Sequence, residues 1–287
     1  MKPLQIYMPF KGHTINVLHW SHKPNSPKYL GKTFLLIHGS PGTVADWESF
    51  PNRLFELGYN VVAFDRPGFG QSTNDSLTKS VHTNTEVTFE IINHMNLSHV
   101  IVYAHSFGAS IAMDILSELE KQPNPIIQKF YLSSGFVIHF PGLGPITPFV
   151  KLGLSDLLVK FVDTLGKTDK LFMSYVKGWF VEKQYFEHYL TNNLPRWANA
   201  DSSITVLHEM RDLHLTLKQL DTMTLKIDTP VYIFNSKNEL PMIIEQSDRL
   251  AQTYDKVEHK LVESGGHFQH IENLDELMEF IKNTATN

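Results

Sequence analysis

The sequence predicts an α/β fold, with a mostly parallel central sheet flanked by helices. Short runs of β-branched and apolar residues alternate with longer segments that carry apolar residues at helical spacing, and the alternation returns near the C-terminus after a long interruption. Strands and helices that alternate in this way are typical of a parallel sheet with crossover helices. The 287 residues suffice for one large domain that carries an insertion.

The expected strands are short apolar runs that end at polar or turn residues. The first lies at residues 13–21 and is expected to pair with residues 4–9 in a hairpin. Further runs, also interpreted as strands, lie at 33–38, 59–65, 99–105, 127–134, 229–236 and 256–263. The sheet is therefore expected to combine an N-terminal and a C-terminal part of the chain.

Helices are expected in the gaps between these strands. Residues 46–58 place apolar side chains at helical spacing and end at Gly58, a residue suited to a helix C-terminus. Residues 80–96 and 107–121 are interpreted as helices on the same grounds. Each of these helices would connect two strands of the sheet.

Residues 138–224 contain no clear strand, and they are interpreted as a helical lid inserted into the α/β core. The core would then consist of residues 1–137 and 225–287. Aromatic and other apolar side chains are frequent in the lid, and they are expected to form its own core and to line an apolar site. Examples are Phe149, Leu157, Phe161, Phe172, Met173, Trp179, Phe180, Tyr185, Phe186 and Trp197.

The composition excludes several classes of function. The chain has 25 Lys and Arg against 30 Asp and Glu, and the basic residues are scattered, so no nucleic-acid partner is expected. The absence of cysteine removes disulfides, thiolate metal sites and a thiol nucleophile. The 15 histidines show none of the zinc-binding spacings. We therefore expect neither a metal nor an organic cofactor.

The N-terminal segment interrupts its apolar residues with Pro3, Gln5, Pro9 and Lys11. It therefore lacks the continuous apolar stretch of a signal peptide or membrane helix. No membrane span is predicted, and the cytoplasm is the expected location. The sequence carries no indication of an oligomeric state.

The strongest local signal for catalysis is Val-Tyr-Ala-His-Ser-Phe-Gly-Ala-Ser at 102–110, where a predicted strand meets Ser106 and then a predicted helix. A serine nucleophile at such a tight turn requires small residues two positions before and after it, and these are Ala104 and Gly108. The same short pattern also occurs in ordinary strand-to-helix turns. The preceding strand and following helix favour Ser106 as a nucleophile.

The sequence His-Gly-Ser-Pro-Gly follows the predicted strand 33–38. Acyl transfer requires two backbone N–H groups that face the developing oxyanion, one from this loop and one from the residue after the nucleophile. The predicted donors are Ser40 and Phe107. A turn that needs glycine and proline only for its geometry is the alternative.

Four motifs together resemble the α/β-hydrolase superfamily, in the branch that carries a helical lid. They are HGSPG at 38–42, DRPGFGQS at 65–72, AHSFGAS at 104–110 and GGHF at 265–268, and they occur in the family's order. The resemblance covers nearly the whole chain outside the lid and implies an α/β-hydrolase fold. Within the second motif, Asp65, Gly68 and Gly70 are interpreted as structural.

The resemblance also implies the catalytic base. His267 follows the last predicted strand and two glycines, where the family presents this residue. A histidine with a pKa near neutrality can accept the serine proton and return it to the leaving group. Gly265 and Gly266 would let the loop bring His267 over Ser106, and His270 is expected to be a bystander.

The acid partner of His267 departs from the family pattern. Relatives place an aspartate after the strand that corresponds to 229–236, but here that position holds Asn238, and Glu239 follows it. Only Glu239 can carry the negative charge that stabilises an imidazolium. Glu239 is therefore the predicted acid, and orientation of the ring by Asn238 is the alternative.

A serine at position 106 argues against the family branches that attack with aspartate, the haloalkane dehalogenases and epoxide hydrolases. We predict a serine hydrolase that cleaves an ester-type bond of a small hydrophobic substrate through an acyl-enzyme on Ser106. One alternative is an amidase or peptidase, because HGSPG is similar to the HGGPG of proline iminopeptidases. Another is a slow or non-catalytic ligand-binding member of the fold.

Overall fold

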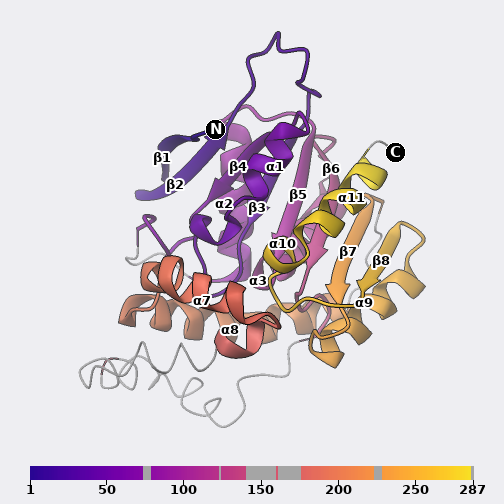
Figure 1. Ribbon diagram of the computed structural model, residues 1–287. Helices are drawn as coiled ribbons and strands as arrows, with labels where there is room; N and C mark the ends of the chain where they lie inside the picture. The colour runs from indigo at the N-terminus through magenta and orange to yellow at the C-terminus, as the bar shows by residue number, and fades with distance from the viewer. Residues whose placement is uncertain (74–78, 123, 140–159, 161–175, 223–227, 286–287) are drawn as a thin grey trace.

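A single sheet forms the centre of the computed structural model, which describes residues 1–73, 79–122, 124–139, 160, 176–222 and 228–285. Across these residues the sheet has eight strands in the order β1-β2-β4-β3-β5-β6-β7-β8. Figure 1 shows helices on both of its faces and further helices beyond the edge where the parallel strands end. The predicted α/β-hydrolase fold, with its mostly parallel sheet, is confirmed.

The strands lie where the apolar runs predicted them. The hairpin β1–β2 is antiparallel, β2 also pairs antiparallel with β4, and all the remaining pairs are parallel. The strands are β1 (Leu4–Phe10), β2 (His13–Trp20), β3 (Thr33–Ile37), β4 (Asn60–Phe64), β5 (Val100–His105), β6 (Ile127–Ser133), β7 (Val231–Ser236) and β8 (Val257–Val262).

The α-helices and 3-10 helices of the described residues connect these strands or follow them. They are η1 (Val44–Trp47), α1 (Phe50–Glu56), α2 (Val81–His94), α3 (Phe107–Lys121), η3 (Lys177–Trp179), α7 (Lys183–Asn192), η4 (Leu194–Arg196), α8 (Ala200–Thr222), α9 (Pro241–Thr253), α10 (Gln269–Glu272) and α11 (Leu274–Ala285). Helices α2 and α3 fall within the predicted ranges 80–96 and 107–121.

The predicted helix at 46–58 is wrong in one respect, because the segment divides into η1 and α1. Glu48 has φ 45 and separates the two elements. Pro51 lies in the first turn of α1, where its missing N–H and fixed φ are tolerated, but it could not continue a helix from the preceding residues. The apolar spacing alone did not reveal this break.

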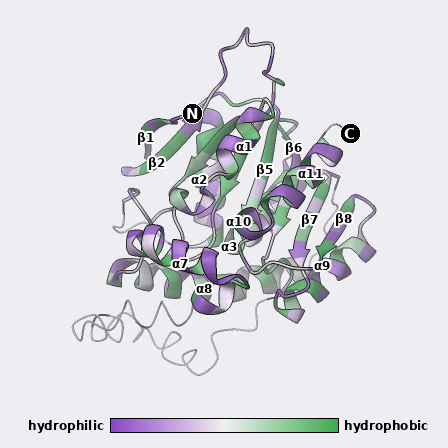
Figure 2. Ribbon diagram, viewed as in Figure 1, coloured by the Kyte–Doolittle hydropathy of each residue, from purple (hydrophilic) through white to green (hydrophobic). Residues whose placement is uncertain are grey.

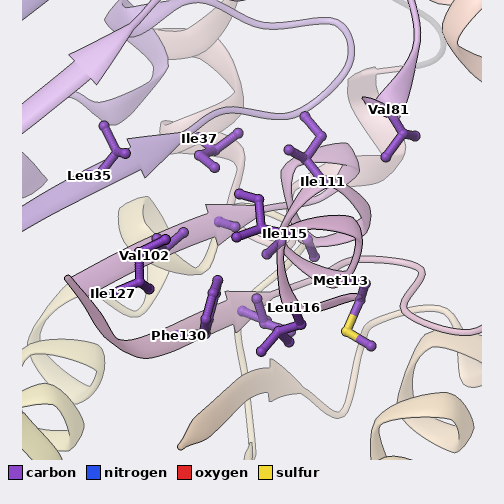
Figure 3. Packing of buried hydrophobic residues seen from close by; sticks show 14 of the residues in the cluster. Leu35, Ile37, Val81, Val102, Ile111, Met113, Ile115, Leu116, Ile127 and Phe130 are labelled. Carbon is purple, nitrogen blue, oxygen red and sulfur yellow. The ribbon is translucent and has the colours of Figure 1, made fainter. Parts of the chain in front are cut away.

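Each face of the sheet packs against its own set of helices. On one face, α3 turns its apolar side toward β3, β5 and β6, as Figure 3 shows for Ile111, Ile115 and Leu116 against Leu35, Val102 and Phe130. On the other face, a second cluster joins apolar residues of α1 and α11 to the sheet. Figure 2 shows the hydropathy of these elements, with apolar residues along the central strands and polar residues on the outer sides of the helices.

Part of the predicted lid lies outside the described residues, including Phe149, Leu157, Phe161, Phe172 and Met173. In the described part, Phe180, Tyr189 and Trp197 form an apolar cluster with Phe268, which follows β8. The division into a core and an inserted lid at 138–224 therefore stays a prediction. None of the helices among the described residues has the length and apolar character to cross a membrane.

Candidate active site

The residues that the sequence singled out lie in loops at the carboxyl ends of neighbouring parallel strands. Ser40 follows β3, Ser106 follows β5, Glu239 follows β7 and His267 follows β8. Because β3, β5, β6, β7 and β8 are successive neighbours in the sheet, these loops share one edge. Ligands of open α/β sheets bind at this edge.

Ser106 lies at a sharp turn between β5 and α3. Its backbone has φ 55 and ψ −120, a conformation that non-glycine residues rarely adopt. The turn requires close packing around it. A Cβ atom added to Gly108 would lie 2.3 Å from the Ile37 carbonyl oxygen, and one added to Gly39 would lie 2.8 Å from the Ser106 Cβ. The small residues near Ser106 therefore permit the approach of β3 and its loop to the serine.

A continuous chain of hydrogen bonds joins the three predicted catalytic residues. The His267 Nε2 atom lies 3.0 Å from the Ser106 Oγ, and the His267 Nδ1 atom lies 2.9 Å from the Glu239 Oε2. Asn238, the alternative acid position, instead donates from Nδ2 to the Gly265 carbonyl at 3.3 Å. Glu239 therefore contacts the ring, and Asn238 contacts the loop that carries it.

The charge of Glu239 fixes the tautomer of His267. Burial acts to raise the pKa of Glu239, but the charge of His267 and the hydrogen bonds from His267 and from the Leu240 N–H together outweigh it, so the pKa lies below its usual value. An ionised carboxylate can only accept, so the His267 Nδ1 donates to Glu239. The Nε2 atom is then free to accept the proton of the Ser106 hydroxyl.

The predicted oxyanion donors belong to two segments next to Ser106. Phe107 is the first residue of α3, where backbone N–H groups lack partners within the helix and the helix dipole favours negative charge. Ser40 is buried and follows Gly39, which packs against the Ser106 side chain. Both N–H groups therefore belong to segments that contact the nucleophile.

Three other histidines near the site are buried and have lowered pKa values. Burial lowers the pKa of His270 to about 3, and its Nε2 lies 3.1 Å from the Asp46 carbonyl. Burial also lowers the pKa values of His38 and His105 well below their usual range. These rings are therefore neutral, and the contact of His270 with Asp46 agrees with its interpretation as a bystander.

The loop residues that were interpreted as structural have structural partners. The Asp65 carboxylate accepts from the backbone N–H groups of Val44 and Gln71 and from the side chain of Asn16, all between 2.8 and 2.9 Å. A Cβ atom added to Gly70 would lie 2.2 Å from this carboxylate. The loop thus folds around Asp65.

Two contacts of the site went unrecognised in the sequence. Trp179 was noted only as a lid aromatic, but its backbone carbonyl accepts a hydrogen bond from the His267 N–H at 2.6 Å. Its ring centroid also lies 5.8 Å from that of His267. Arg66 of the DRPGFGQS motif contacts the loop at His38 and Gly39 and pairs with Glu209 of α8. Local patterns carry no signal for partners so distant in the chain.

One side-chain cluster in the described part of the chain has the composition of a metal site. His82, Asp114 and Glu118 offer ligand atoms within 4.8 Å of one another. The His82 side chain is 60% exposed, and Lys121 pairs with Glu118 at 2.8 Å, which supplies a positive charge already. These residues do not include any of the candidate catalytic residues.

The comparisons with known proteins concern the family and the fold of the chain. The chain matches the Alpha/beta hydrolase family over residues 34–280. A haloalkane dehalogenase of Mycolicibacterium paratuberculosis is 26% identical over 137 residues, which cover 45% of this chain and 44% of that protein. A protein assigned as the carbamate hydrolase RutD of Agrobacterium fabrum is 25% identical over 245 residues, 85% of this chain and 88% of that one.

The chain spans less than half the length of the first curated relatives that it matches. Among solved structures, an esterase from Exiguobacterium antarcticum has the same fold, with a TM-score of 0.73, 18% identity and 98% coverage of both chains. The family match extends over most of the sequence, and the strand order and the turn at Ser106 agree with it. The chain therefore belongs to the alpha/beta hydrolase family.

Proposed function

We propose that the protein is a serine hydrolase that cleaves an ester-type bond through an acyl-enzyme on Ser106. The observation that carries this proposal is the hydrogen-bonded chain from Ser106 through His267 to Glu239. A serine hydroxyl is a weak nucleophile, and an adjacent base that is itself oriented by a carboxylate activates it. These three side chains have the mutual geometry that this chemistry requires.

In the proposed reaction, the Ser106 Oγ attacks the ester carbonyl while His267 Nε2 accepts its proton. The negative charge that develops on the carbonyl oxygen is stabilised by the N–H groups of Ser40 and Phe107. His267 then donates the proton to the leaving alkoxide, and the acyl group remains on Ser106. Water attacks this ester in the same manner and releases the carboxylic acid.

An apolar acyl group fits the surroundings of the site. The aromatic cluster of Phe180, Tyr189, Trp197 and Phe268 lies beside the loop that carries His267. Arg66 and Glu209 pair with each other and are fully buried, so neither of them offers a free charge to a substrate. We therefore propose a small hydrophobic ester as the substrate class.

Three alternatives are less well supported by these contacts. Dehalogenation through an ester intermediate requires a carboxylate at the turn, and this chain has Ser106 there, although one of its relatives is a haloalkane dehalogenase. A proline-iminopeptidase-like reaction requires acidic groups that hold a substrate amine, whereas Glu239 and Glu209 already pair with His267 and Arg66. A ligand-binding role without turnover does not require the hydrogen bonds that join Ser106, His267 and Glu239.

Labelling with a fluorophosphonate probe tests the nucleophile. We expect the wild type to be labelled and Ser106→Ala to lose both labelling and ester turnover, by about 10³-fold or more. Ser110→Ala is a matched control, because the Ser110 hydroxyl donates to the Phe136 carbonyl and not to His267. An unlabelled wild type would favour the ligand-binding alternative.

Turnover of p-nitrophenyl esters tests the substrate class in the same preparations. We expect kcat/KM to rise from acetate to butyrate, because a longer acyl chain buries more apolar surface. The gain in transition-state stabilisation should be about 0.8 kcal/mol per CH₂ at most. A succinyl ester, which carries a charge, should be turned over more slowly. Equal turnover of the charged and apolar esters would contradict a hydrophobic acyl site.

A further inference from the structure

A fully buried ion pair joins the loop after β4 to the helix α8. The side chains of Arg66 and Glu209 are both 0% exposed, and Arg66 Nη1 and Nη2 donate to the two carboxylate oxygens of Glu209. Removal of two charges from water is expensive, and replacement of such a pair by apolar residues is often neutral or stabilising. Stability alone is therefore a weak reason for this pair.

The remaining donors of Arg66 contact the loop that precedes Ser40. Nε donates to the His38 carbonyl at 3.0 Å, and Nη2 donates to the Gly39 carbonyl at 2.7 Å. The guanidinium carbon also lies 4.7 Å from the ring centroid of Phe107. Arg66 thus contacts both of the segments that carry the proposed oxyanion donors.

His38 acts on the same carbonyl. Its Nε2 lies 3.0 Å from the backbone nitrogen of Arg66, so Nε2 accepts and Nδ1 carries the proton. The Nδ1 atom then donates to the Gly39 carbonyl at 2.8 Å. The Gly39 carbonyl therefore accepts two hydrogen bonds, one of which comes from a charged donor.

The Gly39 carbonyl and the Ser40 N–H belong to one peptide unit. The unit is planar, and in a trans peptide its C=O and N–H point in opposite directions. A cis peptide bond is present between Ser40 and Pro41 but not between Gly39 and Ser40. Donors that hold the carbonyl therefore also set the direction of the N–H, and they polarise it, because hydrogen bonds in series strengthen one another.

We propose that Arg66 is a positioning residue that orients and polarises the Gly39–Ser40 peptide as an oxyanion donor, and that Glu209 of α8 holds Arg66 in place. This inference rests on the proposed ester hydrolysis and deepens it. Helix α8 lies in the segment 138–224 that the sequence predicts to be an insertion. Helix α8 thus contributes to transition-state stabilisation through the loop.

Kinetics of Arg66→Met and of the apolar pair Arg66→Met with Glu209→Met test the proposal. The substrates are p-nitrophenyl butyrate and its thiono analogue, in which sulfur replaces the carbonyl oxygen. Sulfur is a weak hydrogen-bond acceptor, so a well-placed oxyanion donor favours the oxoester. For both variants we expect kcat on the oxoester to fall about 10²-fold, KM to change less than about threefold, and the oxoester preference to fall about tenfold.

The double variant separates positioning from stability, because it leaves no unpaired buried charge. Wild-type kcat and oxoester preference in a folded double variant would overturn the proposal. If both methionine variants unfold, Arg66→Lys, which keeps the charge but not the planar fork, carries the same test. Arg53→Met is the matched control and should match the wild type, since Arg53 pairs with Asp275 at the surface.

Failure of the proposed function would have a different result. In that case the wild type itself would not turn over either ester, or Ser106→Ala would retain turnover. A wild type with Ser106-dependent turnover and an unaffected double variant would reject only the role of Arg66 and Glu209.

Discussion

Ser106 has a backbone conformation that non-glycine residues rarely adopt, with φ 55. Such a residue costs of the order of 1–3 kcal/mol and persists only where its surroundings hold it. Here its N–H donates to the Ser133 carbonyl of β6 at 2.8 Å, and Gly39 packs against its side chain. The rigid sheet therefore maintains a strained turn that projects the hydroxyl toward His267.

The acid of the proposed triad can be tested at a single position. Glu239→Gln keeps the shape of the side chain but removes the charge that stabilises the imidazolium, so we expect kcat to fall about 10²–10⁴-fold with little change in KM. Asn238→Ala is the control, because Asn238 contacts the Gly265 carbonyl and not the ring. A larger loss in Asn238→Ala than in Glu239→Gln would refute the assignment of the acid.

At the scale of elements, η1 is joined to the α7–η4 region through Asp46. This carboxylate accepts from the Thr43 N–H at 2.9 Å and from the Asn193 side chain at 3.2 Å. Burial raises the pKa of Asp46 to about 7, although these hydrogen bonds act to lower it. The folded protein therefore binds a proton at Asp46 that the unfolded chain releases at lower pH.

This shift predicts a pH dependence of stability. The folded pKa of Asp46 is raised from 3.8 to about 7, so its contribution is full below about pH 4 and is lost as the pH rises to about 7. We expect the free energy of unfolding of the wild type, relative to Asp46→Asn, to decrease by of the order of 1–4 kcal/mol between pH 5 and 8. Urea unfolding measures this difference. Asp275→Asn, at an 88% exposed side chain, should show no such trend.

At the scale of the whole molecule, the candidate site depends on strands from both ends of the chain. Ser106 follows β5, and Glu239 and His267 follow β7 and β8, which are separated from β6 by the predicted insertion. The parallel pairing of β6 with β7 brings these segments together. The helix α11 supports them by packing on the sheet beside α1.

Loss of this packing should reduce stability without altering chemistry. Ile281 of α11 is fully buried in the cluster that joins α1, α11 and the sheet. We expect Ile281→Ala to lower the free energy of unfolding by about 2–5 kcal/mol, because it leaves a cavity. Urea unfolding tests this, with the exposed Glu279→Ala as control. Equal stability of the two variants would show that α11 contributes little to the fold.

The sequence by itself was enough to predict the strands, the helices α2 and α3, and that Ser106 and His267 follow β5 and β8. Apolar periodicity specifies strands and helices because a buried face repeats with the period of the element. Gly108 marks the turn because a larger residue there would collide with the backbone at Ile37. The break between η1 and α1 escaped prediction, since apolar spacing continues through it.

Only the tertiary structure decided which side chains meet. Asn238 and Glu239 are adjacent in the sequence, and the direction of the backbone after β7 determined that Glu239 contacts His267. Arg66 and Glu209 are 143 residues apart, and their pairing depends on how α8 packs against the sheet. A local sequence pattern predicts whether a segment is a helix or a strand, whereas a contact between distant residues depends on the packing of the whole chain.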